Sequence, residues 1–215
     1  MMVPASAPPA LTQIVQRYQQ TSRGVVAFRM HRTLDVHGAL KSRHEDIVMQ
    51  GIYQDGATVK VHVNSYTIDG HSASASDMSA LEDSWEHPKP SDVFAAPFDP
   101  SHVESYEYQQ SGPSTIDFSS SVHDAGHGRG SFTYNAQNDV VSVTYQPNAL
   151  PPHASSGQIT DLRSEVLPGY WAITQETQQY KGNYGPFPAA GTLQVAFSNF
   201  RRFPDLQSAL RALNS

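Results

Sequence analysis

The sequence contains no cysteine, and that absence excludes a disulfide framework, a thiolate zinc site and a cysteine nucleophile. Basic side chains are also few: 14 Lys and Arg stand against 20 Asp and Glu, so the formal net charge is −6. A chain without a basic stripe has little with which to neutralise phosphates, so nucleic acid is not an expected partner. No apolar run reaches the roughly 18–20 residues that span a bilayer, so no transmembrane segment is expected.

The chain begins MMVPASAPPA, with neither a charged n-region nor an apolar h-region, so no intact signal peptide is expected in this segment. Residues 1–9 are predicted to be a flexible leader. This leader is either the stub of a removed export signal or an ordinary frayed terminus. Residues 10–215 show no internal repeat and no shift of composition, and they are predicted to form a single domain.

Three short helices are predicted from apolar residues spaced three and four apart. The first spans about ten residues, with a single apolar stripe formed by Leu11, Ile14, Val15 and Tyr18. The second covers 77–85, and its inner face is formed by Met78, Leu81 and Trp85. The third covers 204–213 with Pro204 at its first position, and its apolar side is formed by Leu206, Leu210 and Leu213.

Apolar and polar residues alternate with period two through most of the remaining chain, which predicts strands. The expected strands are 26–36, 44–54, 58–66, 103–110, 115–122, 130–135, 140–146, 158–167, 170–180 and 193–203. Asp55-Gly56 and Asn138-Asp139 mark tight hairpin turns between them. An antiparallel sheet of about ten strands cannot stay flat, so it is expected to curl, with the helices on its concave side. The predicted fold class is therefore mainly β with a few helices (α+β).

The sequence carries no sharp catalytic signature. His123 and His127 stand four apart, but Gly126 and Gly128 argue against a helix that would face both imidazoles toward one metal ion. No Gly-x-Ser-x-Gly elbow occurs. No catalytic residue, metal ligand or cofactor is predicted, and a His-dependent hydrolase or metalloenzyme is kept as the weakest alternative.

Met and aromatic side chains are more informative, because their shapes suit a flexible acyl chain in an apolar cavity. The candidate lining residues are Phe28, Met30, Val61, Val63, Trp85, Phe118, Phe132 and Trp171. For any one of them ordinary core packing is the simpler interpretation. The proline-rich segment 86–100 is expected to be a lid over the cavity.

Four segments resemble the periplasmic lipoprotein carriers of the LolA/LolB-like superfamily, over about residues 10 to 203. They are VVAFRM (25–30), GSFTYNAQNDVVSVTY (130–145), EVLPGYWAITQET (165–177) and TLQVAFSNFRRF (192–203). The resemblance implies a curled antiparallel sheet that forms an unclosed half-barrel around short helices and holds acyl groups in the Gram-negative envelope. The helix over 204–213 extends beyond the family pattern, and no lipobox cysteine is present.

These patterns lead to one functional expectation and one main rival. The expectation is a soluble periplasmic protein that binds lipid acyl chains or a lipidated protein without chemistry, with an envelope protein as a further possible partner. The rival is a protein–protein interaction module of the same fold with a filled core. Because one fold hosts several roles, the architecture does not decide between them.

Overall fold

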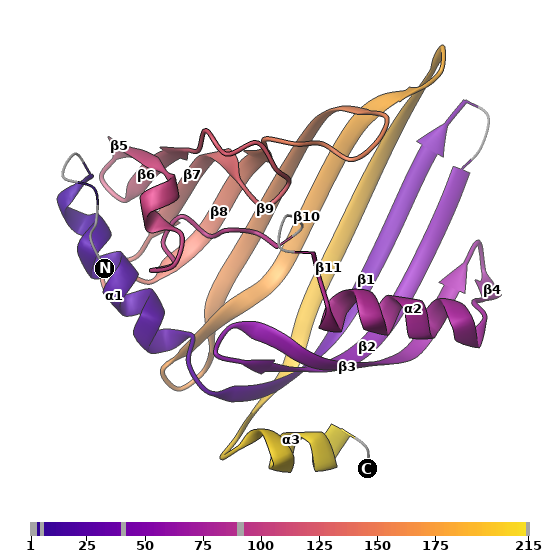
Figure 1. Cartoon of the computed structure of the whole chain (residues 1–215), viewed down its shortest axis with the longest axis horizontal. Coiled ribbons are helices and arrows are strands. Elements are labelled where there is room, and N and C mark those ends of the chain that lie inside the picture. The colour runs from indigo at the N-terminus through magenta and orange to yellow at the C-terminus, as the bar shows by residue number, and fades with distance from the viewer. Residues whose placement is uncertain (1–3, 5–6, 40–41, 90–92, 214–215) are drawn as a thin grey trace.

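The computed structural model describes residues 4, 7–39, 42–89 and 93–213. It holds one antiparallel sheet of eleven strands, in the order β4-β3-β2-β1-β11-β10-β9-β8-β7-β6-β5 (Figure 1). The strands are β1 (Val25–Gly38), β2 (Ser42–Gln54), β3 (Ala57–Ile68), β4 (His71–Ser72), β5 (Glu107–Gly112), β6 (Thr115–Ser119), β7 (Gly128–Tyr134), β8 (Val140–Pro147), β9 (Ala154–Leu167), β10 (Tyr170–Tyr184) and β11 (Phe187–Phe203).

Every pair of hydrogen-bonded strands is consecutive in the chain except the pair of β1 and β11, the last strand. That ladder runs from Val25 opposite Phe203 to Gly38 opposite Ala189. Strands β4 and β5 stand at opposite ends of the sheet, which is not closed. The predicted fold class, a mainly β chain with an open, half-barrel sheet and short helices, is confirmed.

Both predicted hairpin turns are present. Asp55 and Gly56 have φ values of 52° and 88°, in the left-handed region that a two-residue turn between β2 and β3 requires. Asn138 has a φ of 64° in the turn between β7 and β8. Asn and Asp tolerate this conformation better than other side chains with a Cβ, which is why the sequence signal was dependable here.

The three helices are α1 (Pro9–Thr21), α2 (Ala75–Glu86) and α3 (Leu206–Leu213). A capping box starts α2, because the Ser74 hydroxyl accepts from the Asp77 N–H and the Asp77 carboxylate accepts from the Ser74 N–H. The predicted start of the last helix at Pro204 is wrong. Its N-terminus is set by the Asp205 carboxylate, which accepts from the N–H of Ser208 at 2.7 Å.

One face of the sheet, here called the inner face, is covered by α1 and α2. Neighbouring residues of β1 point to opposite faces of the sheet. Phe28 and Met30 lie on the face that α2 covers, whereas Val25 and Ala27 pack against α3. Helix α3 therefore lies on the outer face. The expectation that all the helices fill the concave side is wrong for α3 and holds for α1 and α2.

The strand boundaries differ from the predictions in several places; for example, β6 ends at Ser119 instead of 122, and β9 begins at Ala154 instead of 158. Val103 to Ser105 form a 3₁₀ turn before β5 begins, whereas a strand from 103 was expected. The β10–β11 hairpin is longer than expected, reaching Tyr184 and resuming at Phe187. Residues 181–192 lack clean alternation, but the ladder between β11 and the far end of β1 keeps them in the sheet, where they extend it as the long hairpin of Figure 1.

Candidate functional site

Two apolar clusters lie on the inner face. The α2 cluster is formed by Phe28, Met30, Ile47, Met49, Val61, Val63 and Val195 from β1, β2, β3 and β11. The α1 cluster is formed mainly by β6 to β9 and α1, with Leu11, Ile14, Val15, Phe98, Ile116, Phe118, Phe132, Val143, Tyr145 and Ile159 among its members. Paired residues run across the sheet from Val143 through Asp161, Glu176 and Val195, so both clusters share one face.

The sheet residues of the α2 cluster are buried, and aromatic rings pack around Phe28. The cluster's seven residues are at most 5% exposed. The Phe28 ring stacks on Tyr53 with centroids 4.3 Å apart, and Phe197 meets it edge to face at 5.6 Å. Gly51 leaves the space for this ring, because a Cβ at that position would collide with it. The two methionines give the surface a shape that can adapt to different contacts.

Helix α2 covers this cluster without burying any of its own residues. Met78, Leu81 and Trp85 pack against the cluster while remaining partly exposed. Two carboxylates hold the helix to the edge of the sheet. The Glu82 carboxylate accepts from the Val63 N–H at 2.8 Å, and that of Glu86 accepts from the Val61 N–H at 3.1 Å.

Those two N–H groups lie along the edge of β3 that faces away from β2. On that edge, β4 pairs only with Thr67 and Ile68. The carboxylates of α2 therefore take the place of a neighbouring strand's carbonyl groups. Lys60 also pairs with Glu86 at 2.7 Å, and His62 with Glu82 at 3.2 Å. A helix fixed mainly by half-exposed polar contacts is held less firmly than one fixed by buried apolar area.

The α1 cluster is closed more tightly. Phe98 is 1% exposed, and its ring meets Tyr18 and Phe132 edge to face with centroids 5.0 and 5.4 Å away. Phe94 stacks on Tyr145 at 4.2 Å. The segment after α2 was expected to be a lid. In this structure its part from 94 to 98 packs into the α1 cluster, and residues 90–92 lie outside the described residues.

The eight predicted lining residues separate into three groups. Phe28, Met30, Val61 and Val63 form much of the α2 cluster, with Trp85 above them. Phe118 and Phe132 belong to the α1 cluster instead. Trp171 lies in β10 outside both clusters, half-buried. Among the described residues its indole N–H has no hydrogen-bond partner. The structure therefore brings five of the eight together.

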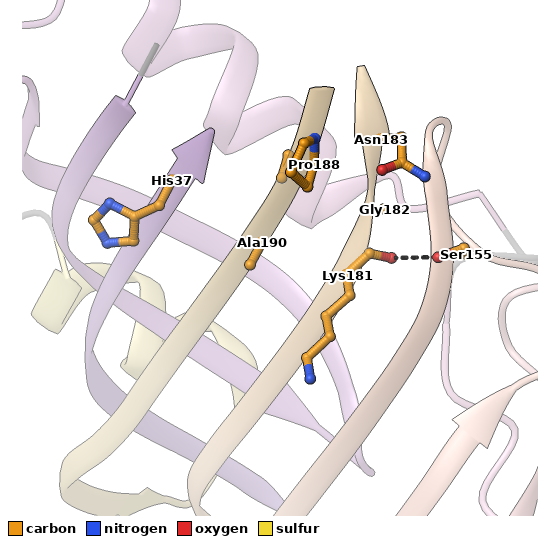
Figure 2. Close-up of a pocket in the computed structure, with 8 residues that line it drawn as sticks. His37, Ser155, Lys181, Gly182, Asn183, Pro188 and Ala190 are labelled. Atoms are coloured by element: carbon orange, nitrogen blue, oxygen red, sulfur yellow. Dashed lines mark hydrogen bonds between the residues drawn. The ribbon is translucent and has the colours of Figure 1, made fainter. Parts of the chain in front are cut away.

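Two pockets of about 470 and 430 Å³ lie elsewhere. Figure 2 shows the first, where His37, Ala190, Lys181 and Ser155 lie across four neighbouring strands. The Ser155 hydroxyl donates to the Lys181 carbonyl at 3.2 Å. The second lies over β6 to β9, and Phe118 is the one predicted lining residue in either pocket. The covered α2 cluster, with Trp85 above it, holds five of the eight predicted lining residues, more than either pocket.

Sequence reasoning missed a pair of carboxyl groups between the two clusters, on neighbouring strands. Asp161 of β9 and Glu176 of β10 stand directly opposite each other. Burial, together with the nearby charge of Glu176, raises the pKa of Asp161 to about 8. Burial also raises the pKa of Glu176. The available signal was Asp161 at the inward position two residues after Ile159, where alternation calls for an apolar residue.

The histidine motif that the sequence singled out forms a local contact. His127 Nδ1 lies 2.8 Å from the Asp124 carboxylate, which also accepts from the His127 backbone N–H. Over the described part of the chain, no three His, Cys, Asp or Glu side chains are placed to hold a metal ion. Among the same residues, no helix has the length and apolarity needed to cross a membrane.

Comparisons with known proteins give likenesses of fold. No family model and no curated protein sequence matches the chain. A putative outer membrane lipoprotein-sorting protein domain from Vibrio parahaemolyticus is 13% identical, with a TM-score of 0.45 over 95% of this chain and 98% of that one. A DUF1329 family protein from Desulfovibrio piger is 11% identical, with a TM-score of 0.44 over 95% and 97%.

A LolA superfamily protein from Nitrosomonas europaea is 7% identical, with a TM-score of 0.41 over 95% of this chain and 97% of that one. The chain is thus similar in fold to a LolA superfamily protein and to a lipoprotein-sorting domain, as the sequence resemblance predicted.

Proposed function

We propose that the protein binds acyl chains of a lipid or of a lipidated protein on the α2 cluster, without catalysing a reaction. The observation that carries this proposal is the mismatch between the cluster and its cover. Seven apolar side chains of the sheet, two of them methionines, form one continuous buried surface. The helix above that surface has no buried residue of its own.

Apolar burial, taken alone, favours exchange of the helix for an acyl chain. Each half-buried side chain among Met78, Leu81 and Trp85 contributes about 1 kcal/mol, from roughly 2 kcal/mol for full burial. An acyl chain gains about 0.8 kcal/mol for each CH₂ that it buries, so about four CH₂ groups match the three side chains. A chain of twelve or more carbons exceeds that amount, and α2 can act as a displaceable cover.

The setting that we propose is the periplasm of a Gram-negative cell, with an envelope protein as donor or acceptor of the ligand. This part rests on the four sequence segments that resemble lipoprotein carriers. In this setting no ATP site or catalytic centre is required, because exchange between partners is driven by their relative affinities for the acyl chain.

Native mass spectrometry, with organic extraction, tests the proposal on protein purified from a Gram-negative host without detergent. We expect near-stoichiometric acyl lipid. Trp85→Ala and Trp171→Ala are a matched pair, because both tryptophans are partly exposed but only Trp85 contacts the α2 cluster. Trp85→Ala should change the amount of bound lipid, and Trp171→Ala should leave it unchanged.

The rival function is a protein–protein interaction module with a filled core. One observation favours it: in this structure, protein side chains cover both clusters. A clean apo mass, with no uptake of a fluorescent fatty acid, would contradict acyl binding and leave the interaction module as the better account.

A further inference from the structure

The pair Asp161 and Glu176, here called the acid pair, lies where the two apolar clusters meet. Across the sheet, Asp161 stands opposite Val143 of the α1 cluster, and Glu176 stands opposite Val195 of the α2 cluster. Two neighbouring carboxyl groups on the apolar inner face are costly, because burial and mutual repulsion both oppose their ionisation. A pair retained at this place calls for a compensating partner.

For Asp161 the compensation is partial, because the charge of Arg163 lowers its pKa against the larger effect of burial. Its residue is 3% exposed, and within the described residues its Oδ1 atom has no hydrogen-bond partner. Glu176 is better satisfied, because its carboxylate accepts from the Gln178 amide at 2.7 Å. The Gln178 carbonyl in turn accepts from the Tyr180 hydroxyl at 3.2 Å. One buried acceptor therefore remains open beside an organised carboxylate.

Two tyrosines lie beside the acid pair: Tyr145 stands opposite Ile159, two residues before Asp161, and Tyr180 is hydrogen-bonded to the Gln178 that holds Glu176. Burial raises the pKa of Tyr145 well above its ordinary value, and the charges of Asp161 and Glu176 add to that effect. Burial also raises the pKa of Tyr53 and Tyr180, with Glu176 contributing to both. Carboxylates among aromatic rings are the surroundings that favour an organic cation, through ionic hydrogen bonds and cation–π attraction.

Two arginines also face this region. The Arg163 guanidinium lies over the rings of Tyr18 and Phe98, 5.3 and 5.7 Å from their centroids, and donates to the Trp171 carbonyl at 3.4 Å. Arg32 of β1 stands opposite Val195 and lowers the pKa of Glu176 against the larger effect of burial. Neither arginine donates a hydrogen bond to Asp161 Oδ1 among the described contacts.

We propose that the acid pair is the binding site for a protonated amine, the head group of an amphiphile whose chain lies on the α2 cluster. This inference rests on the proposed function and names its ligand class. A primary ammonium has three donors, which can reach Asp161 Oδ1, the Glu176 carboxylate and a tyrosine hydroxyl. Its charge replaces the proton that the pair otherwise holds, so binding releases that proton to solvent.

The test compares dodecylammonium with dodecanol, which have the same chain, below their micelle concentrations on the full-length protein. We expect the amine to bind at least about tenfold more tightly. Asp161→Asn and Glu176→Gln should each remove that preference while leaving the affinity for dodecanol unchanged. Asp117→Asn, at an exposed acid of β6, is the matched control and should keep the preference.

Calorimetry at pH 7 in two buffers of different ionisation enthalpy gives a second readout. The wild type should release a proton when dodecylammonium binds, and Asp161→Asn should release less. If dodecanol binds and dodecylammonium binds no more tightly, the amine site is overturned while acyl binding stands. If neither compound binds, the proposed function fails as well. A preference for dodecanoate over dodecylammonium also overturns the amine site.

Discussion

The two halves of the inner face differ in how they are covered. Under α1, the helix contributes Leu11, Ile14 and Val15 to the core, and all three are fully buried. Under α2, the sheet is equally well buried, but the helix contributes no buried residue. The same sheet thus carries one helix that is part of the core and one that only lies on it. That difference separates a structural cover from a removable one.

Polar contacts follow the same division. Arg17 of α1 donates two hydrogen bonds to Asp139, at 2.6 and 3.2 Å, and the side chain of Asp139 is 3% exposed. Helix α2 relies on Glu82 and Glu86, which reach an open strand edge beside half-exposed partners. Hydrogen-bonded charge pairs in protected surroundings contribute more than exposed ones. Both kinds of contact therefore make α1 the more firmly held helix.

The largest expected effect is on the α1 side. Ile14→Ala leaves a cavity in a fully buried site, so it should lower the free energy of unfolding by about 2–5 kcal/mol. Leu81→Ala on half-buried α2 should cost about 1 kcal/mol or less. Urea denaturation of both variants measures the two values. Equal losses would show that α2 is as much a part of the core as α1.

Asp139→Ala should have the next largest effect, because it leaves Arg17 without its partner and removes a buried carboxylate. We expect a loss of about 1–3 kcal/mol, reduced from the value for a fully buried pair because the Arg17 side chain is 35% exposed. Asn138→Ala, at the adjoining turn, is an unsuitable control because its φ is positive. Gln137→Ala is exposed and should change the unfolding free energy little.

Much of this fold could be predicted from the sequence, for reasons visible at particular positions. The spacing of Leu11, Ile14, Val15 and Tyr18 indicated α1, and Asp55-Gly56 marked a turn, because both signals are local. The core role of 94–98 was missed, since Phe98 finds its partners only in the folded sheet. The acid pair was missed for the same reason: Asp161 and Glu176 meet through strand register, which neither strand reveals alone.

Asp161, at the boundary between the two halves, should make the free energy of unfolding depend on pH. Its folded-state pKa of about 8 exceeds the unfolded value of about 3.9, so the native state binds more protons between these values. The stability contributed by protonated Asp161 is therefore present in full below pH 4 and is lost as pH rises to 8. Asp161→Asn should remove this loss and be about 1–3 kcal/mol more stable than the wild type at pH 8.

Denaturation at pH 4.5, 6, 7 and 8 measures that difference, with Asp117→Asn as the exposed control. The gain from Asp161→Asn should grow with pH, while the control stays close to the wild type throughout. A gain that does not change with pH would show that Asp161 is already ionised in the native state, and it would remove the main support for a proton shared within the acid pair.

The smallest effect in free energy is the sharpest test of how α2 is held. Glu82→Gln replaces an ionic acceptor of the Val63 N–H by a neutral one, so its hydrogen bond weakens while global stability changes by about 0.5 kcal/mol or less. Hydrogen exchange should then accelerate at Val63. It should accelerate at Val61 as well, because Glu86 lies on the same helix and leaves with it. Faster exchange at Val63 alone would mean that α2 does not move as a unit and would contradict its role as a displaceable cover.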